Sequence, residues 1–161
     1  MRLLGIILIS TIPAAVGFMK SAKAAKCCEQ AAAAVYAVDE VWQCIRYQSL
    51  PICDIINHLC GAKRLEILGL HMPDDWGEID KMIEAAVRQS DINDEKTADI
   101  LLEFLCSLGK SDLSGQQSVC ELYRKKAADY YDDLKQQLKG TRRLYSALGV
   151  LGSLFCAVLM I

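Results

Sequence analysis

The sequence predicts an all-α protein in which a helical bundle is flanked by N- and C-terminal membrane-spanning helices. Apolar residues recur at three- and four-residue steps through most of the chain, which is the period of amphipathic helices. No stretch alternates with period two over a convincing length, and glycines and prolines fall between the periodic segments. The hydrophobic fraction is 53%, above the roughly 45–50% usual for soluble proteins, and the excess lies at the two ends.

The N-terminal segment, residues 1–19, is almost entirely apolar and predicts the first spanning helix. Its downstream flank is more basic than its upstream flank, so the positive-inside rule places the following chain in the cytosol. The lysines concerned are Lys20, Lys23 and Lys26. A competing interpretation is a signal peptide cleaved after Ala24, leaving an exported helical domain tethered by its C-terminal helix. The charge asymmetry favours the uncleaved anchor.

The last third of the chain predicts one long helix that runs from a polar rod into an apolar tail. We expect it to begin at Ser114, because Gln117 completes the spacing of a capping box. Residues 144–161 carry no charge, and as a helix they would span about 27 Å, close to the roughly 30 Å hydrocarbon thickness of a bilayer. Basic residues precede this segment and again indicate a cytosolic approach: Lys139, Arg142 and Arg143.

These patterns divide the chain into an N-terminal transmembrane helix (1–19), a cytosolic helical bundle (20–143) and a C-terminal transmembrane helix (144–161), with both termini outside. Thiols stay reduced in the cytosol, so we expect the eight cysteines to behave as small apolar residues rather than to form disulfides. Gly140, between the polar rod and its basic end, is a candidate hinge.

Five segments are expected between the spans and the last helix. An amphipathic helix continues from the first span and ends before Pro51, with its apolar stripe at Cys27, Ala31, Ala34, Val35, Val38, Val41, Trp42 and Ile45. Short helices follow over residues 52–61 and 62–70. Asp74 or Asp75 is expected to cap the next helix. After a turn at residues 90–93, Asp94 and Glu95 open a helix that ends near Gly109, with its stripe at Ala98, Leu101, Leu102, Leu105 and Leu108.

The sequence offers little support for catalysis or for a cofactor. Two cysteines and two histidines could be considered as a zinc set, but their spacing matches none of the usual ligand patterns; they are Cys53, His58, Cys60 and His71. The Gly109-Lys110-Ser111 triplet lacks the upstream glycine of a phosphate-binding loop. Nucleic acid is not expected as a partner, because the formal net charge is −2 and the acidic middle of the chain would repel phosphates. We predict neither enzyme activity nor a cofactor or metal.

Acidic residues at the start of the helix expected after Asp74 form a candidate docking surface for a basic partner or a divalent cation. The residues concerned are Asp74, Asp75, Glu78 and Asp80. Such a run is also typical of a solvated helix face, and the sequence leaves both interpretations open.

The C-terminal half resembles the stage III sporulation protein AB family. The resemblance lies in Leu108-Gly109-Lys110-Ser111-Asp112 with Gln116, and in the run from Arg142-Arg143-Leu144-Tyr145 to Gly149-Val150-Leu151-Gly152 before the apolar end. Leu4-Gly5, Gly17-Phe18 and Leu50-Pro51-Ile52 extend the likeness to the N-terminal part. The soluble part of that family is similar to the cytoplasmic domains of the type II secretion platform protein, the F family.

The resemblance implies a non-enzymatic platform in the channel between mother cell and forespore. It implies a multi-pass protein of the mother-cell (outer forespore) membrane that couples a cytosolic secretion-type ATPase to other stage III channel proteins, and possible homo-oligomers. On this basis Asp112 and Gln116 join Asp74, Asp75 and Glu78 as candidate ATPase-docking residues.

Overall fold

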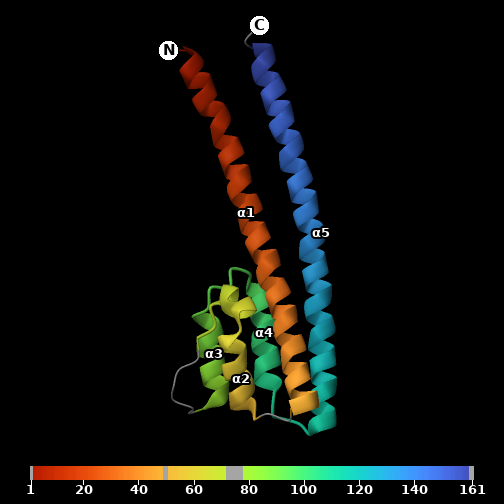
Figure 1. The fold of residues 1–161 in the computed structure, drawn as a ribbon. Helices are drawn as coiled ribbons and strands as arrows, with labels where there is room; N and C mark the ends of the chain where they lie inside the picture. Colours follow the sequence, from red (N-terminus) through yellow and green to blue (C-terminus); the bar gives the residue numbers. More distant parts are fainter. Residues whose placement is uncertain (1, 49–50, 72–77, 160–161) are drawn as a thin grey trace. The chain divides into compact units, whose positions relative to one another are not determined.

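The computed structural model describes the backbone of residues 2–48, 51–71 and 78–159, and the side chains of residues 19–47, 51–71, 78–141, 143–145 and 147–148. Every regular element in these ranges is helical (Figure 1). The elements are α1 (Arg2–Gln43), a π-helix (Cys44–Gln48), α2 (Ile52–Gly61), a 3-10 helix (Lys63–Leu68), α3 (Ile79–Arg88), α4 (Glu95–Ser107) and α5 (Leu113–Leu159). The predicted all-α fold class is therefore confirmed.

The chain forms two compact units, and α1 and α5 contribute to both. One unit comprises Met1–Lys26 and Asp133–Ile161, and the other comprises Cys27–Asp132. Among the described residues, no helix combines the length and the apolar character that crossing a membrane requires. The side chains of residues 1–18 and 149–161, which make up most of the two predicted spans, lie outside the described residues.

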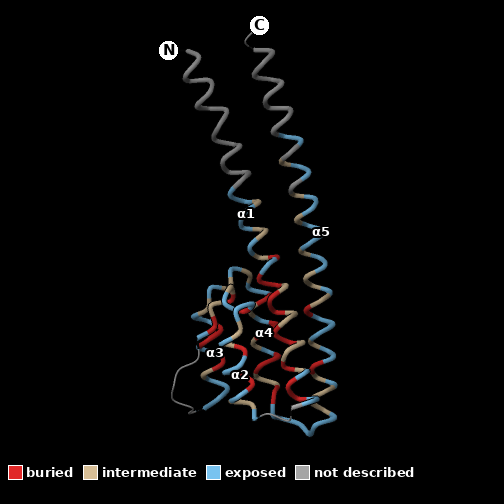
Figure 2. Tube along the Cα trace, in the orientation of Figure 1, coloured by how far each residue is buried: buried red, intermediate tan, exposed pale blue. Residues whose placement is uncertain are grey.

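The core of the Cys27–Asp132 unit is built from α1, α2, the 3-10 helix, α3, α4 and the first turns of α5. Buried residues concentrate along the inner sides of these helices (Figure 2). Val38 and Val41 of α1, Leu68 of the 3-10 helix and Leu101 and Phe104 of α4 are all fully buried in one cluster. The stripe predicted for α1 contributes Val38, Val41 and other members to this core, so its amphipathic character is confirmed.

A buried amide on α1 joins the 3-10 helix to the loop before α4. Gln30 is fully buried, and its Nε2 donates to the carbonyls of Ile67 (3.2 Å) and Asp91 (2.6 Å). Its Oε1 accepts from the backbone N–H of Asn93 at 2.9 Å. Both ends of the side chain are therefore used, which is what makes a buried amide tolerable. The sequence pattern gave no sign of this residue.

The end of the 3-10 helix and the loop before α4 also meet directly beside Gln30. The N–H of Asp91 donates to the carbonyl of Leu68 at 3.1 Å, and Gly69 ends the 3-10 helix with φ +62°. A Cβ at Gly69 would lie 3.0 Å from the nitrogen of Asp91, so glycine is needed here both for its backbone conformation and for the close approach.

Helix α4 buries a face rotated from the one predicted. Its buried residues are Thr97, Ile100, Leu101, Phe104 and Leu105, whereas Ala98 and Leu102 are only half-buried. Thr97 is accommodated because Oδ2 of Asp94 accepts from its N–H (2.8 Å) and its hydroxyl (2.7 Å). The same Oδ2 accepts from the hydroxyl of Tyr130 on α5 at 2.8 Å. Asp94 thus caps α4, as predicted, and also joins it to α5.

Helix α3 begins later than predicted. Its N-cap is Glu78, whose side chain makes no capping hydrogen bond, and its first residue is Ile79. The predicted capping residues Asp74 and Asp75 lie outside the described residues. Ile83, Ala86 and Val87 form the buried face of the helix, whereas Ile79 at its start is exposed.

Replacing Gln30 with leucine should destabilise the protein by about 3 kcal/mol, because the carbonyls of Ile67 and Asp91 and the N–H of Asn93 would lose their side-chain partner in a buried site. Urea denaturation of the full-length chain, followed by circular dichroism, measures the change. Glu29→Ala, at the exposed neighbouring position, is the control and should change the stability by less than about 0.5 kcal/mol. Equal effects of the two substitutions would contradict this role of Gln30.

Two glycines should respond oppositely to alanine. Gly109 has φ +77°, and an added Cβ would overlap Cδ1 of Ile52, whereas Gly140 lies inside α5 with nothing within 4 Å of an added Cβ. Gly109→Ala should cost about 2 kcal/mol, and Gly140→Ala should stabilise by about 0.5–1 kcal/mol. The same denaturation experiment tests both, and a stabilising Gly109→Ala would show that this turn is not constrained as described. The proposed hinge at Gly140 stays a prediction.

Candidate functional site

The predicted docking residues that the structure describes lie at one end of the Cys27–Asp132 unit. The start of α3, the end of α4 and the start of α5 meet there (Figure 1). Glu78 is exposed and pairs with Lys81 one turn along, with Nζ 2.7 Å from Oε2. Surface pairs of this kind contribute little to stability, so Glu78 remains accessible to a partner.

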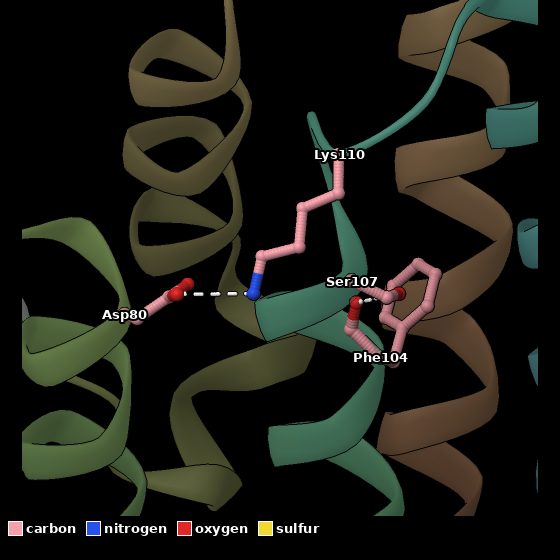
Figure 3. Close-up of polar contacts among 4 residues, drawn as sticks. All are labelled: Asp80, Phe104, Ser107 and Lys110. Atoms are coloured by element: carbon pink, nitrogen blue, oxygen red, sulfur yellow. Dashed lines mark hydrogen bonds and ion pairs between the residues drawn. The ribbon is translucent and has the colours of Figure 1, made fainter.

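Asp80 and Lys110 connect α3 to the turn between α4 and α5. The Nζ of Lys110 lies 3.0 Å from Oδ2 of Asp80, and both side chains are more than half exposed (Figure 3). In the last turn of α4, close to this pair, the hydroxyl of Ser107 donates to the carbonyl oxygen of Phe104 at 2.5 Å. The acidic run is therefore partly neutralised by a lysine from the adjoining turn.

Asp112 caps the long helix α5. Its Oδ1 accepts from the N–H of Gly115 at 3.0 Å, its Oδ2 accepts from the hydroxyl of Ser114 at 3.0 Å, and its carbonyl accepts from the N–H of Gln116 at 2.8 Å. The backbone hydrogen bond from Gly115, followed by the one from Ser114, lowers the pKa of the Asp112 carboxyl. The prediction that Ser114 caps α5 was wrong, because the helix begins at Leu113 and Asp112 supplies the cap.

Gln116 closes the same turn from the other side. Its Nε2 donates to the carbonyl of Ser111 at 2.9 Å. Gly115 is required at this start, because an added Cβ would lie 2.8 Å from Cβ of Ser111 and 2.9 Å from Oδ1 of Asp112. Asp112 and Gln116 are thus brought together, as parts of the turn itself.

The basic residues predicted to flank the membrane belong to the other unit. Each one whose side chain is described is exposed: Lys20, Lys23, Lys26, Lys139 and Arg143. The side chain of Arg142 lies outside the described residues.

An aromatic and cationic cluster that the sequence pattern did not reveal lies where α1 ends. The guanidinium carbon of Arg46 is 4.7 Å from the ring centroid of Trp42 and 5.5 Å from that of Tyr47. The two rings meet edge to face, with centroids 6.3 Å apart. Tyr47 is 71% exposed. Trp42 also packs against the core, in line with its place on the predicted apolar stripe, whereas Arg46 and Tyr47 belong to the π-helix of Cys44–Gln48.

The cysteines and histidines considered for zinc have other contacts. Nε2 of His58 lies 3.1 Å from Oε1 of Glu40 on α1, and Nδ1 of His71 donates to the carbonyl of Gly69 at 2.9 Å. Among the described residues, no three side chains of the metal-binding types are placed to hold one ion together. A cavity of about 290 Å³ is lined by Cys60 and His71 together with Leu59, Leu65, Glu66, Gly69 and Leu70.

Three thiols of this unit are poor nucleophiles. Burial raises the pKa of Cys120 to about 11. Burial, helped by the charge of Glu40, also raises the pKa of Cys44, and burial followed by the charge of Asp80 raises that of Cys106. Since the thiolate is the reactive form, these side chains act as apolar packing groups at neutral pH.

Comparison with known proteins identifies the family. The model of the stage III sporulation protein AB family matches residues 2–161. The chain belongs to the stage III sporulation protein AB family. Searches among curated proteins and among solved structures found no match.

In this member of the stage III sporulation protein AB family, the segment that carried the resemblance builds the α4–α5 turn. Gly109 supplies the positive φ and the close approach to Ile52. Lys110 pairs with α3, the carbonyl of Ser111 accepts from Gln116, and Asp112 caps α5. Each polar member of the segment therefore has a structural contact.

The cap at Asp112 predicts a specific acid response. Its pKa is lowered in the folded state, so it stabilises the fold above its ordinary pKa of about 4, and this contribution is lost as the pH falls through the lowered pKa. Asp112→Asn keeps a capping side chain without the titration. Denaturation of full-length wild type and variant between pH 2 and pH 7, in steps of about one unit, should show a weaker loss of stability in the variant at acid pH. Identical pH profiles would contradict the assignment.

Proposed function

We propose that this protein is a non-enzymatic membrane platform of the sporulation channel, which couples a cytosolic secretion-type ATPase to other stage III channel proteins. Membership of the stage III sporulation protein AB family over residues 2–161 is the observation that carries the proposal. The resemblance of this family's soluble part to the secretion platform F family suggests the coupling role.

The sequence of the two ends supports attachment to the membrane. The apolar segments 1–19 and 144–161 each adjoin basic residues on the side of the helical domain. The basic residues whose side chains are described are exposed. By the positive-inside rule this arrangement puts residues 20–143 in the cytosol and both termini outside. In a sporulating cell the membrane would be the mother-cell (outer forespore) membrane.

The character of the Cys27–Asp132 unit suits a scaffold. Its histidines contact Glu40 or the backbone, and burial raises the pKa of three of its thiols. Helices α1 and α5 enter this unit at one end, at Cys27 and Asp132, while the π-helix and the α4–α5 turn lie at the other end of the same helices. The latter end is the proposed contact for the ATPase, with Asp74, Asp75 and Glu78 as acidic docking residues.

Topology provides the first test. Reporter fusions placed after Lys26, after Ser90 and after Lys139 should all report a cytosolic location, while a tag following Ile161 should be accessible from outside. Mass spectrometry of the purified protein should detect an intact segment 1–19. An external location of the central fusions, or cleavage after Ala24, would favour the exported domain.

Partner binding provides the second test. The full-length protein should retain the secretion-type ATPase of the same sporulation system in a pull-down. Neutralising the acidic residues with Asp74→Asn, Asp75→Asn and Glu78→Gln should weaken retention by about tenfold. Glu84→Gln, a change in the pair with Arg88 later on α3, is the matched control. Unchanged retention in the triple variant would remove the acidic surface from the proposal.

A further inference from the structure

We propose that Trp42, Arg46 and Tyr47 form a docking platform for an acidic segment of a soluble partner protein. Arg46 lies over the rings of Trp42 and Tyr47, and both Arg46 and Tyr47 are exposed. The proposal rests on the proposed role as a platform for soluble partners, but it assigns a surface that the acidic docking residues do not include.

The platform lies where α1 gives way to the π-helix. Trp42 is in the last turn of α1 and Tyr47 is in the π-helix of Cys44–Gln48. Their rings, five residues apart in the sequence, meet edge to face with centroids 6.3 Å apart. Such interruptions of α-helices occur frequently at functional sites.

The cation of the platform is Arg46, which contacts the aromatic rings of Trp42 and Tyr47. Arg88 and Arg124 each hold a carboxylate, at 2.7 Å from Glu84 and 2.6 Å from Asp39. Arg46 has no ion pair with any side chain that the structure describes. It is exposed and lies over Trp42 and Tyr47. Stacking leaves the guanidinium edge, with its fork of N–H donors, available to a carboxylate.

The surroundings favour an acidic peptide over other occupants. Tyrosine, tryptophan and arginine are the residues most enriched at the energetic centres of protein interfaces. The same end of the unit carries exposed Leu113 (61%) and exposed Ile79 (37%), which would contact apolar neighbours of the bound acid. A nucleic acid would need an extended basic face to pair with its phosphates, whereas the platform offers the single cation of Arg46 and the chain has a formal net charge of −2.

Site-specific photo-crosslinking in sporulating cells tests this surface. The full-length protein carries p-benzoylphenylalanine at Gln43, an exposed position on α1 next to the platform, and a second strain carries it at Leu122, an exposed position on α5. Mass spectrometry identifies the crosslinked peptide. We expect a Gln43 adduct with a peptide rich in aspartate or glutamate, and no such adduct from Leu122.

Charge variants in the Gln43 crosslinking strain decide the role of Arg46. Arg46→Glu should reduce the adduct by about tenfold, because a charge-assisted hydrogen bond is replaced by repulsion. Arg46→Lys should keep more of the adduct, since the charge remains while the planar fork is lost. Thermal melting confirms that each variant is folded, as expected for an exposed side chain.

Three results would overturn the proposal: an adduct with a second copy of this chain, an adduct that persists undiminished in Arg46→Glu, or no adduct above that from Leu122. Each leaves the proposed platform function open, because the topology and ATPase tests do not involve this cluster. Loss of ATPase retention together with a persistent acidic adduct at Gln43 would instead contradict the proposed function and leave this surface standing.

Discussion

The fold of the Cys27–Asp132 unit depends on one buried amide. Gln30 joins helix α1 to Ile67, at the end of the 3-10 helix, and to Asp91 and Asn93, in the loop before α4. The backbone N–H and C=O groups of a loop have no hydrogen-bond partners within a helix, and burying such groups unpaired costs free energy. Among the described side chains no buried N or O atom lacks a hydrogen-bond partner. Gln30 supplies partners to three such backbone groups, where the 3-10 helix and the loop before α4 meet α1.

The end of the unit that is proposed to meet partners is held by short-range polar contacts. Asp112 and Gln116 organise the first turn of α5, and Lys110 ties that turn to α3. Exposed pairs add little stability, but the cap and the positive φ of Gly109 define where α4 ends and α5 begins. This segment is one of the two in the C-terminal half that carry the family resemblance, and its residues act first as turn builders.

The succession of helices along the chain could largely be predicted from the sequence, because the apolar periods and the breaks at Pro51, Gly61 and Gly69 are local signals. The face predicted for α4 was right at Leu101, Leu105 and Leu108, which are buried, but packing against the rest of the core turns Phe104 inward in place of Leu102. The start of α5 was wrong by one residue because Ser114 and Asp112 are both good caps. The π-helix and the role of Gln30 have no local signal, since each depends on distant contacts. The membrane spans and the docking residues stay predictions.

Native-state hydrogen exchange at the backbone amide of Asn93 tests the central structural claim most directly. This amide lies in a loop, and its bond is to Oε1 of Gln30 at 2.9 Å. If Gln30 holds the loops to the core, Asn93 should exchange only through unfolding of the whole Cys27–Asp132 unit, with a protection free energy matching that from denaturation. Fast exchange of Asn93 through local opening, while core amides of α4 stay protected, would contradict the account.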